Sequence, residues 1–137
     1  MMDAMATRRV RWYQAIGRPV FFALPPETSH RLATAMLGLP LPWSRFGAGA
    51  DDASLATDLG GLRLRNPIGL AAGFDKTCRH LDTLGAIGFG YVVGGTVTRA
   101  ARAGNPSPRI VRSGLRRSIV NAMGLPNPGA EAAAAAR

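Results

Sequence analysis

The chain has 137 residues, 47% of them apolar, and a formal net charge of +9. This length and apolar content predict one folded domain rather than a disordered chain. A single cysteine, Cys78, excludes an internal disulfide framework and fits a reducing compartment. No spaced His/Cys set predicts a zinc site, and no run approaches the ~20 apolar residues of a membrane-spanning helix.

The excess of positive charge does not predict a nucleic-acid partner. The basic residues are scattered as singles and pairs, such as Arg8-Arg9, Arg63, Arg65 and Arg116-Arg117, rather than gathered on one element. A nucleic-acid surface concentrates them on one face. The same field attracts anionic membranes and small anions, so we expect no nucleic acid and keep the other two partners open.

Residues 1–46 predict a small helical hairpin. Apolar residues recur at spacings of three and four between Val10 and Leu24, with expected interruptions at Gly17 and Pro19. Pro25-Pro26 stops this segment, and a second helix is predicted from Glu27, in which Leu32, Met36 and Leu39 share a face with Ala33 and Leu37. This basic hairpin would expose Trp12, Phe21, Phe22 and Trp43 to a membrane interface, or its apolar stripe would pack on the next domain.

The pattern changes after a Gly/Ala/Asp linker at 47–54. Residues 56–64 predict a β-hairpin that turns at Gly60-Gly61. Residues 68–72 are typical of a buried parallel strand, residues 77–87 of a helix, and residues 91–93 of a second strand. This order of strand, helix and strand is the unit from which parallel sheets and (β/α)₈ barrels are built.

The last third of the chain alternates loops with short apolar runs. Residues 99–109 form a Gly/Pro/Arg-rich loop of a length that is usually functional. Ile110-Val111 and Ile119-Val120 predict two short strands, and a polar turn follows at 121–127. An alanine run from Glu131 predicts the start of a helix.

Candidate site residues follow the predicted strands, because parallel βα folds bind ligands at the carboxyl ends of their strands. Ala71-Ala72-Gly73 would let a flat ring approach the backbone. Lys76, the one lysine in the chain, would reach the edge of that ring, where a cation stabilises a reduced flavin. Thr96 offers a hydroxyl, and Asn121 offers a donor and an acceptor to a planar amide.

Four strings in order resemble the N-terminal part of class 2 dihydroorotate dehydrogenase, the quinone-linked flavoenzyme of pyrimidine synthesis. They are NPIGLAAGFDK, LGAIGFGYVVGGTVT, GNPSPRIVR and IVNAMGLPN. LPPETSHRLATAMLGL is similar to the helical extension of that family, so the resemblance runs from about residue 18 to the end.

The resemblance implies an α/β fold, a (β/α)₈ TIM barrel that holds FMN at its C-terminal face, preceded by the helical hairpin. It implies that FMN is lined by Ala72, Gly73, Phe74, Asp75, Lys76 and Thr96. It implies that dihydroorotate or orotate is contacted by Lys76, Asn121, Ala122, Met123, Gly124 and Leu125. The hairpin would form the mouth for a membrane quinone, in a peripheral protein on the cytoplasmic face of the cell membrane. No metal is implied.

The implied reaction passes a hydride from dihydroorotate to FMN and then electrons to the quinone. The catalytic base of the family is a serine, which would lie beyond Arg137. A barrel of this type takes ~250 residues, so we expect a fragment with an extension at 1–46, a linker at 47–54 and the first βα units at 55–137. The family commonly shows Asn-Arg-Met-Gly-Phe-Asn-Asn where this chain has residues 121–127. This departure affects the substrate contacts more than the FMN contacts.

Two other functions fit the sequence. The chain could be a non-catalytic remnant whose basic helical hairpin binds a membrane or a partner. A nucleic-acid-binding module is the third hypothesis, and it predicts a steep salt dependence of DNA binding.

Overall fold

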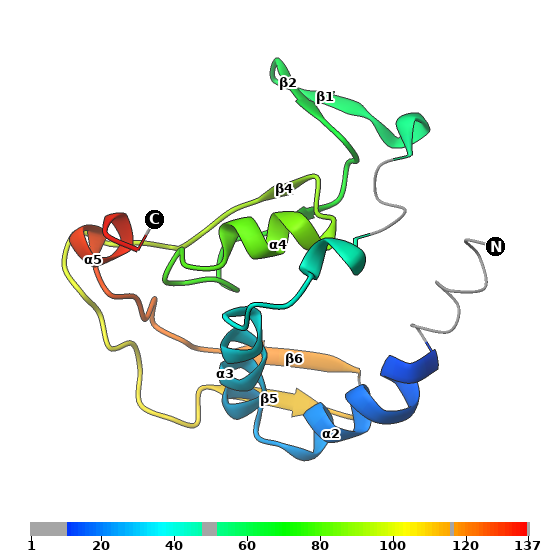
Figure 1. The fold of residues 1–137 in the computed structure, drawn as a ribbon. Helices are drawn as coiled ribbons and strands as arrows, with labels where there is room; N and C mark the ends of the chain where they lie inside the picture. Colours follow the sequence, from blue (N-terminus) through cyan, green and yellow to red (C-terminus); the bar gives the residue numbers. More distant parts are fainter. Residues whose placement is uncertain (1–10, 48–51, 116, 137) are drawn as a thin grey trace.

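The computed structural model describes residues 11–47, 52–115 and 117–136. Three two-stranded sheets and a set of short helices make up this part of the chain (Figure 1). The predicted residues Arg8, Arg9, Val10, Arg116 and Arg137 lie outside it. In chain order, the elements are η1 (Tyr13–Gly17), α2 (Arg18–Ala23), α3 (Pro26–Leu37), η2 (Trp43–Arg45), η3 (Ala53–Leu55), β1 (Thr57–Leu59), β2 (Leu62–Leu64), β3 (Gly69–Leu70), α4 (Leu81–Ile87), β4 (Tyr91–Val92), β5 (Ile110–Ser113), β6 (Ser118–Asn121) and α5 (Ala130–Ala134).

The first helical segment runs through both predicted interruptions. Gly17 ends a single π-helical turn and is buried against Tyr13, where an added Cβ would lie 3.0 Å from the ring. Pro19 falls in the first turn of α2, a position at which a missing N–H costs little. The predicted interruption is therefore a change of helix type and not a break, because the π turn ends at Gly17 and α2 follows directly from Arg18.

The second helix buries only part of its predicted apolar face, namely Leu37. Ser29 and Leu37 are the buried residues of α3, whereas Leu32 and Met36 are 41% and 42% exposed. The Ser29 hydroxyl donates to the Phe21 carbonyl at 2.6 Å, which fastens α3 to α2. The predicted stripe of Leu32, Met36 and Leu39 is therefore open to solvent, and a polar contact holds the hairpin together.

A β-hairpin made of β5 and β6 packs against the helical hairpin. β5 pairs antiparallel with β6 in the register Val111↔Val120, which confirms the two short strands. Arg112 of β5 donates from Nη1 to the carbonyls of Phe21 and Leu24, both at 3.1 Å. These carbonyls end α2 without helical partners, so Arg112 caps that helix. Figure 1 shows α3 crossing β5 and β6, with α2 beside one end of β5.

The predicted hairpin at 56–64 is confirmed. β1 and β2 pair antiparallel with Leu59 opposite Leu62, and Gly60 and Gly61 both take positive φ, of 56° and 85°. Two consecutive positive φ angles give the tight turn that favours glycine. Of the linker, residues 48–51 lie outside the described part, and Asp52 caps η3. In Figure 1 this hairpin projects away from the remaining elements.

The predicted β–α–β unit is present, with three corrections. β3 and β4 pair in parallel, with Gly69 opposite Tyr91 and Leu70 opposite Val92. Both strands are shorter than predicted. Ile68 is 63% exposed, so the first strand is not buried. α4 begins at Leu81 instead of residue 77, because the backbone amides before it bond to a carboxylate of the preceding loop.

Little of the apolar surface is covered within this chain. Among the described residues the buried apolar side chains are Leu37, Leu84 and Ala133. The chain exposes 10061 Å², against about 6,800 Å² for a compact monomer of its mass. Among the described helices, α4 packs against β4, and Ile68, which lies just before β3, is still 63% exposed.

Candidate functional site

The loop after β3 is organised by the carboxylate of Asp75, which is 2% exposed. Its Oδ1 accepts from the amides of Thr77 and Arg79 and from the Thr77 hydroxyl, and Oδ2 accepts from the His80 amide at 2.7 Å. Burial opposes ionisation, but these donors outweigh it and hold the pKa of Asp75 below its ordinary value. The carboxylate therefore fixes the conformation of the loop.

Backbone bonds tie this loop to the segment after β4. The Gly73 amide donates to the Gly95 carbonyl at 2.7 Å, and the Gly95 amide donates to the Asp75 carbonyl at 2.9 Å. Gly73 has a φ of 105°, and a Cβ placed on it would meet nothing within 4 Å. Open space lies beside the backbone at Gly73, as a flat ring approaching it would require.

A cavity of about 560 Å³ lies at the carboxyl ends of β3 and β4. This size is ordinary for a cofactor or substrate site. It brings together most of the predicted site residues from three separate segments. Those that line it are Ala72, Gly73, Phe74, Lys76, Thr96, Asn121, Met123 and Leu125. Asp75, Ala122 and Gly124 do not line it, and their predicted ligand contacts remain predictions.

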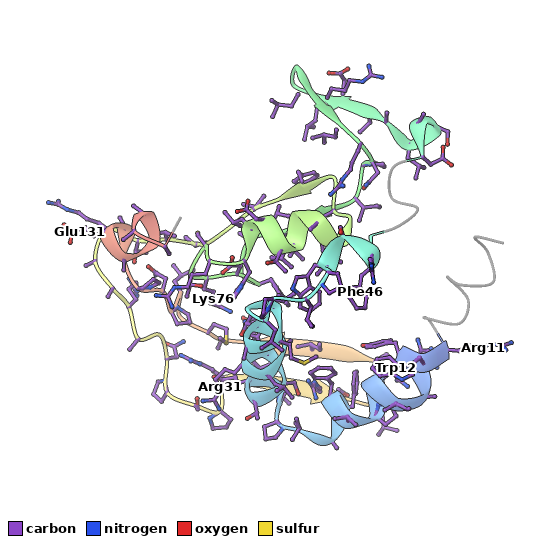
Figure 2. All side chains as sticks on the ribbon, in the orientation of Figure 1. Arg11, Trp12, Arg31, Phe46, Lys76 and Glu131 are labelled. Carbon is purple, nitrogen blue, oxygen red and sulfur yellow. The ribbon has the colours of Figure 1, made fainter. Side chains whose placement is uncertain are left out.

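Lys76 lies between this cavity and a larger one of about 1070 Å³ beside α3. Figure 2 shows it on the loop before α4, close to one end of α3. Burial lowers the pKa of Lys76 below its ordinary value; the Arg109 cation acts in the same direction, and the Glu27 carboxylate opposes both. The ammonium group is thus partly desolvated at the mouth of the cavity, where its charge acts more strongly than in water.

His30 of α3 also lines the cavity of about 560 Å³, although it was not among the site residues expected from the sequence. Its ring meets that of Phe74 edge to face, with centroids 5.1 Å apart. Burial and the Lys76 charge lower the pKa of His30, against a hydrogen bond to the Phe74 backbone and the Asp75 charge. No sequence spacing links a helical histidine to strand ends 40 residues later, so no signal in the sequence alone could have found it.

The polar turn at 121–127 is held in place by its last residue. Asn127, 8% exposed, accepts from the amides of Thr98 and Gly129, both at 3.0 Å, and donates to the Leu125 carbonyl at 2.8 Å. Asn127 therefore joins the segment after β4 to the predicted substrate segment. The sequence analysis assigned this asparagine no role.

The arrangement combines one cation, a hydroxyl and an amide around a largely apolar cavity. Such a site can orient a planar ligand that carries negative charge. Among the described residues, no three His, Cys, Asp or Glu side chains come together to hold a metal ion.

The parallel unit and its strand-end cavity place the chain among the (β/α)₈ barrel proteins. A solved structure titled "ligand-free type DHODH from Eimeria tenella" matches with a TM-score of 0.74 and 33% identity, over 81% of this chain and 30% of that one. A second structure, of DHODH from the same organism in complex with ferulenol, gives a TM-score of 0.72 at 31% identity, over 85% of this chain and 32% of that one.

The family model for dihydroorotate dehydrogenase matches residues 54–137. The dihydroorotate dehydrogenase (quinone) of Rhodospirillum rubrum is 46% identical over 124 residues, which cover 90% of this chain and 33% of the relative. That of Erythrobacter litoralis is 44% identical over 117 residues, 85% of this chain and 33% of the relative. The chain belongs to the dihydroorotate dehydrogenase family and spans about a third of the length of these relatives.

Proposed function

We propose that this chain supplies the first part of a quinone-dependent dihydroorotate dehydrogenase, which oxidises dihydroorotate to orotate in pyrimidine biosynthesis. The observation that carries this proposal is the common cavity. Residues from the ends of β3, β4 and β6, which are far apart in the sequence, converge on one space of ordinary ligand size. They are largely the residues that the family resemblance selects.

FMN is the cofactor we propose for this cavity. Ala72, Gly73, Phe74, Lys76 and Thr96 would hold its ring, and the open space beside Gly73 fits a planar group. When bound, FMN supplies the acceptor for the substrate hydride. In this proposal Lys76 keeps a cation at the ring edge, and the Asp75 side chain acts only by shaping the loop.

The segment 121–125 would contact the substrate. Asn121 is suited to a cyclic amide, because its side chain both donates and accepts hydrogen bonds. Met123 and Leu125 provide apolar walls of the cavity. This chain contains no residue that we assign as the catalytic base.

The helical hairpin of residues 1–46 would lie on the membrane side, with residues 55–137 forming the first βα units. Trp12 and Phe22 are 63% and 54% exposed, and Arg11 and Arg18 lie beside them. Apolar and basic residues in this combination are typical of a peripheral interfacial helix on the cytoplasmic leaflet. In the described part, no helix is long and apolar enough to cross a bilayer. A membrane quinone is the proposed electron acceptor.

A chimeric enzyme tests the proposed function. Residues 54–137 of this chain would replace the matching segment of the Rhodospirillum rubrum relative. We expect the purified chimera to carry flavin and to be bleached by dihydroorotate without oxygen, because the cavity residues would meet the rest of the barrel. Flavin absorbance per protein is the measurement.

The unmodified relative, handled in the same way, is the control. A chimera that folds, as judged by circular dichroism, but carries no flavin contradicts the proposal. A flavin-loaded chimera that dihydroorotate does not reduce contradicts the substrate assignment alone.

A second candidate function is a basic membrane-binding module, which the exposed aromatic residues Trp12 and Phe22 of the first helical segment favour. We expect the 137-residue chain to sediment with vesicles containing anionic lipid, and deletion of residues 1–46 to abolish this. Double replacement of Trp12 and Phe22 by serine is the finer test, because it removes apolar area and no charge. Sedimentation that survives the deletion contradicts a role of the hairpin.

A further inference from the structure

An ion pair joins the helical hairpin to the long loop after β4. Glu27, in the first turn of α3, accepts from Arg109 Nε at 3.1 Å and from the Ser107 hydroxyl at 3.2 Å. The side chains of Arg109 and Glu27 are 17% and 23% exposed. A pair this sheltered is screened less than one at the surface.

The same arginine also holds the loop itself. Its Nη1 donates to the carbonyl of Ala103 at 2.9 Å and to that of Asn105 at 3.1 Å. Arg109 therefore uses separate nitrogens for α3 and for the loop. A guanidinium group can do this because its donors are fixed in a planar fork.

The loop in turn holds the proposed substrate segment. Asn105 donates from its amide to the Met123 carbonyl at 3.0 Å and from its side chain to the Ala122 carbonyl at 2.8 Å. The Ala122 amide donates back to the Arg109 carbonyl at 2.8 Å. The loop therefore holds the backbone of the segment at Ala122 and Met123.

The two segments are also packed too closely to move independently. A Cβ on Gly104 would clash with the Met123 carbonyl oxygen, and a Cβ on Gly124 would lie 2.7 Å from the Asn105 backbone nitrogen. Both glycines have positive φ, of 80° and 72°. These contacts leave no room between the loop and the segment, so a shift of one displaces the other.

We propose that Arg109 is a positioning residue, which transmits the docking of α3 through Glu27 to residues 121–125. That this coupling affects substrate binding rests on the function proposed above. The coupling between α3 and residues 121–125 does not rest on it. Glu27 and Arg109 do not touch the substrate in this proposal. They make the conformation of residues 121–125 depend on whether α3 is in contact with the loop.

Hydrogen exchange of the 137-residue chain, without ligand, tests the coupling. We expect Arg109→Gln to speed exchange about tenfold in peptides covering 103–109 and 119–125, since charged hydrogen bonds are lost on both sides. Glu27→Gln is expected to give a smaller increase in the same peptides. Glu131→Gln, at the only other glutamate of the chain, is the matched control and leaves them unchanged.

Two further variants separate positioning from a merely structural ion pair. Arg109→Lys keeps the charge but not the planar fork, so we expect it to keep an ion pair with Glu27 and to restore only part of the protection of 119–125. The exchange of partners, Glu27→Arg with Arg109→Glu, restores the ion pair but not the donors to Ala103 and Asn105. We expect this double variant to restore the contact of α3, measured as slow hydrogen exchange in residues 26–37. Hydrogen exchange in residues 119–125 should remain fast.

Three outcomes would overturn the proposal: equal exchange in Glu27→Gln and Glu131→Gln, protection of 119–125 in the exchanged pair, or unchanged exchange in Arg109→Gln. Because no flavin or substrate is present, none of these depends on the proposed function. In the chimera, Arg109→Gln should raise the KM for dihydroorotate more than it lowers kcat. A chimera without flavin would count against the function and leave the exchange result standing.

Discussion

Replacing Lys76 with alanine in the flavin-loaded chimera is expected to slow flavin reduction by dihydroorotate about a hundredfold or more. A fixed, partly desolvated charge aimed at developing negative charge contributes on this scale. Lys76 lines the cavity and has its pKa lowered, first by burial and then by Arg109. Stopped-flow measurement of flavin bleaching, without oxygen, gives the rate directly.

Arginine should not rescue this position, because its planar fork is larger than an ammonium group and donates in other directions. Arg63→Ala is the matched control, since it removes a cation from the exposed strand β2 without touching the cavity. We expect that variant to keep the parent rate. A Lys76→Ala enzyme within threefold of the parent rate would remove the lysine from the proposed site.

Replacing Asp75 with alanine is expected to destabilise the chain by about 3 kcal/mol or more. The change leaves the amides of Thr77, Arg79 and His80 without their acceptor, and each buried donor left unpaired costs about 1–3 kcal/mol. Asp75→Asn retains one acceptor oxygen, so we expect it to lower the free energy of unfolding by less than Asp75→Ala does. Urea unfolding, followed by circular dichroism, measures both differences.

The pH dependence of the Asp75 variants has a definite sign. Because folding lowers the pKa of Asp75, its ionised form stabilises the folded state above the pKa of the unfolded chain. That stability is lost as the pH falls through the folded pKa, which lies below the ordinary value of 3.8. The difference between parent and Asp75→Asn should therefore shrink in acid. A constant difference down to pH 2 would contradict the role given to the carboxylate.

Local chemistry was readable from the sequence wherever neighbouring residues decide the structure. Gly60-Gly61 sets its own turn through two positive φ angles, and the β–α–β order followed from apolar runs and glycines. The start of α4 was misjudged, because the Asp75 carboxylate takes the amides that would otherwise open the helix. A carboxylate can accept hydrogen bonds from backbone amides two to five residues later and so delay the start of a helix. Helix propensities of single residues do not take this into account.

Contacts between distant segments were not readable in this way. His30 joins the cavity from α3, and Arg109 links α3 to residues 121–125, yet no spacing in one sequence connects these positions. The buried face of α3 was only partly predicted. Leu37 belongs to the apolar pattern, but Ser29 is buried because its hydroxyl bonds to a carbonyl of α2, and apolar periodicity does not detect such a polar contact.

The solitary lysine has a consequence for labelling. Besides the N-terminus, Lys76 carries the only primary amine in the chain, and the guanidinium groups of the arginines do not react with acylating reagents at neutral pH. Burial favours its neutral, nucleophilic form. Apart from the N-terminal amine, an acylating tag would therefore attach at the mouth of the cavity in the unaltered sequence, where its spectrum would report the binding of a ligand.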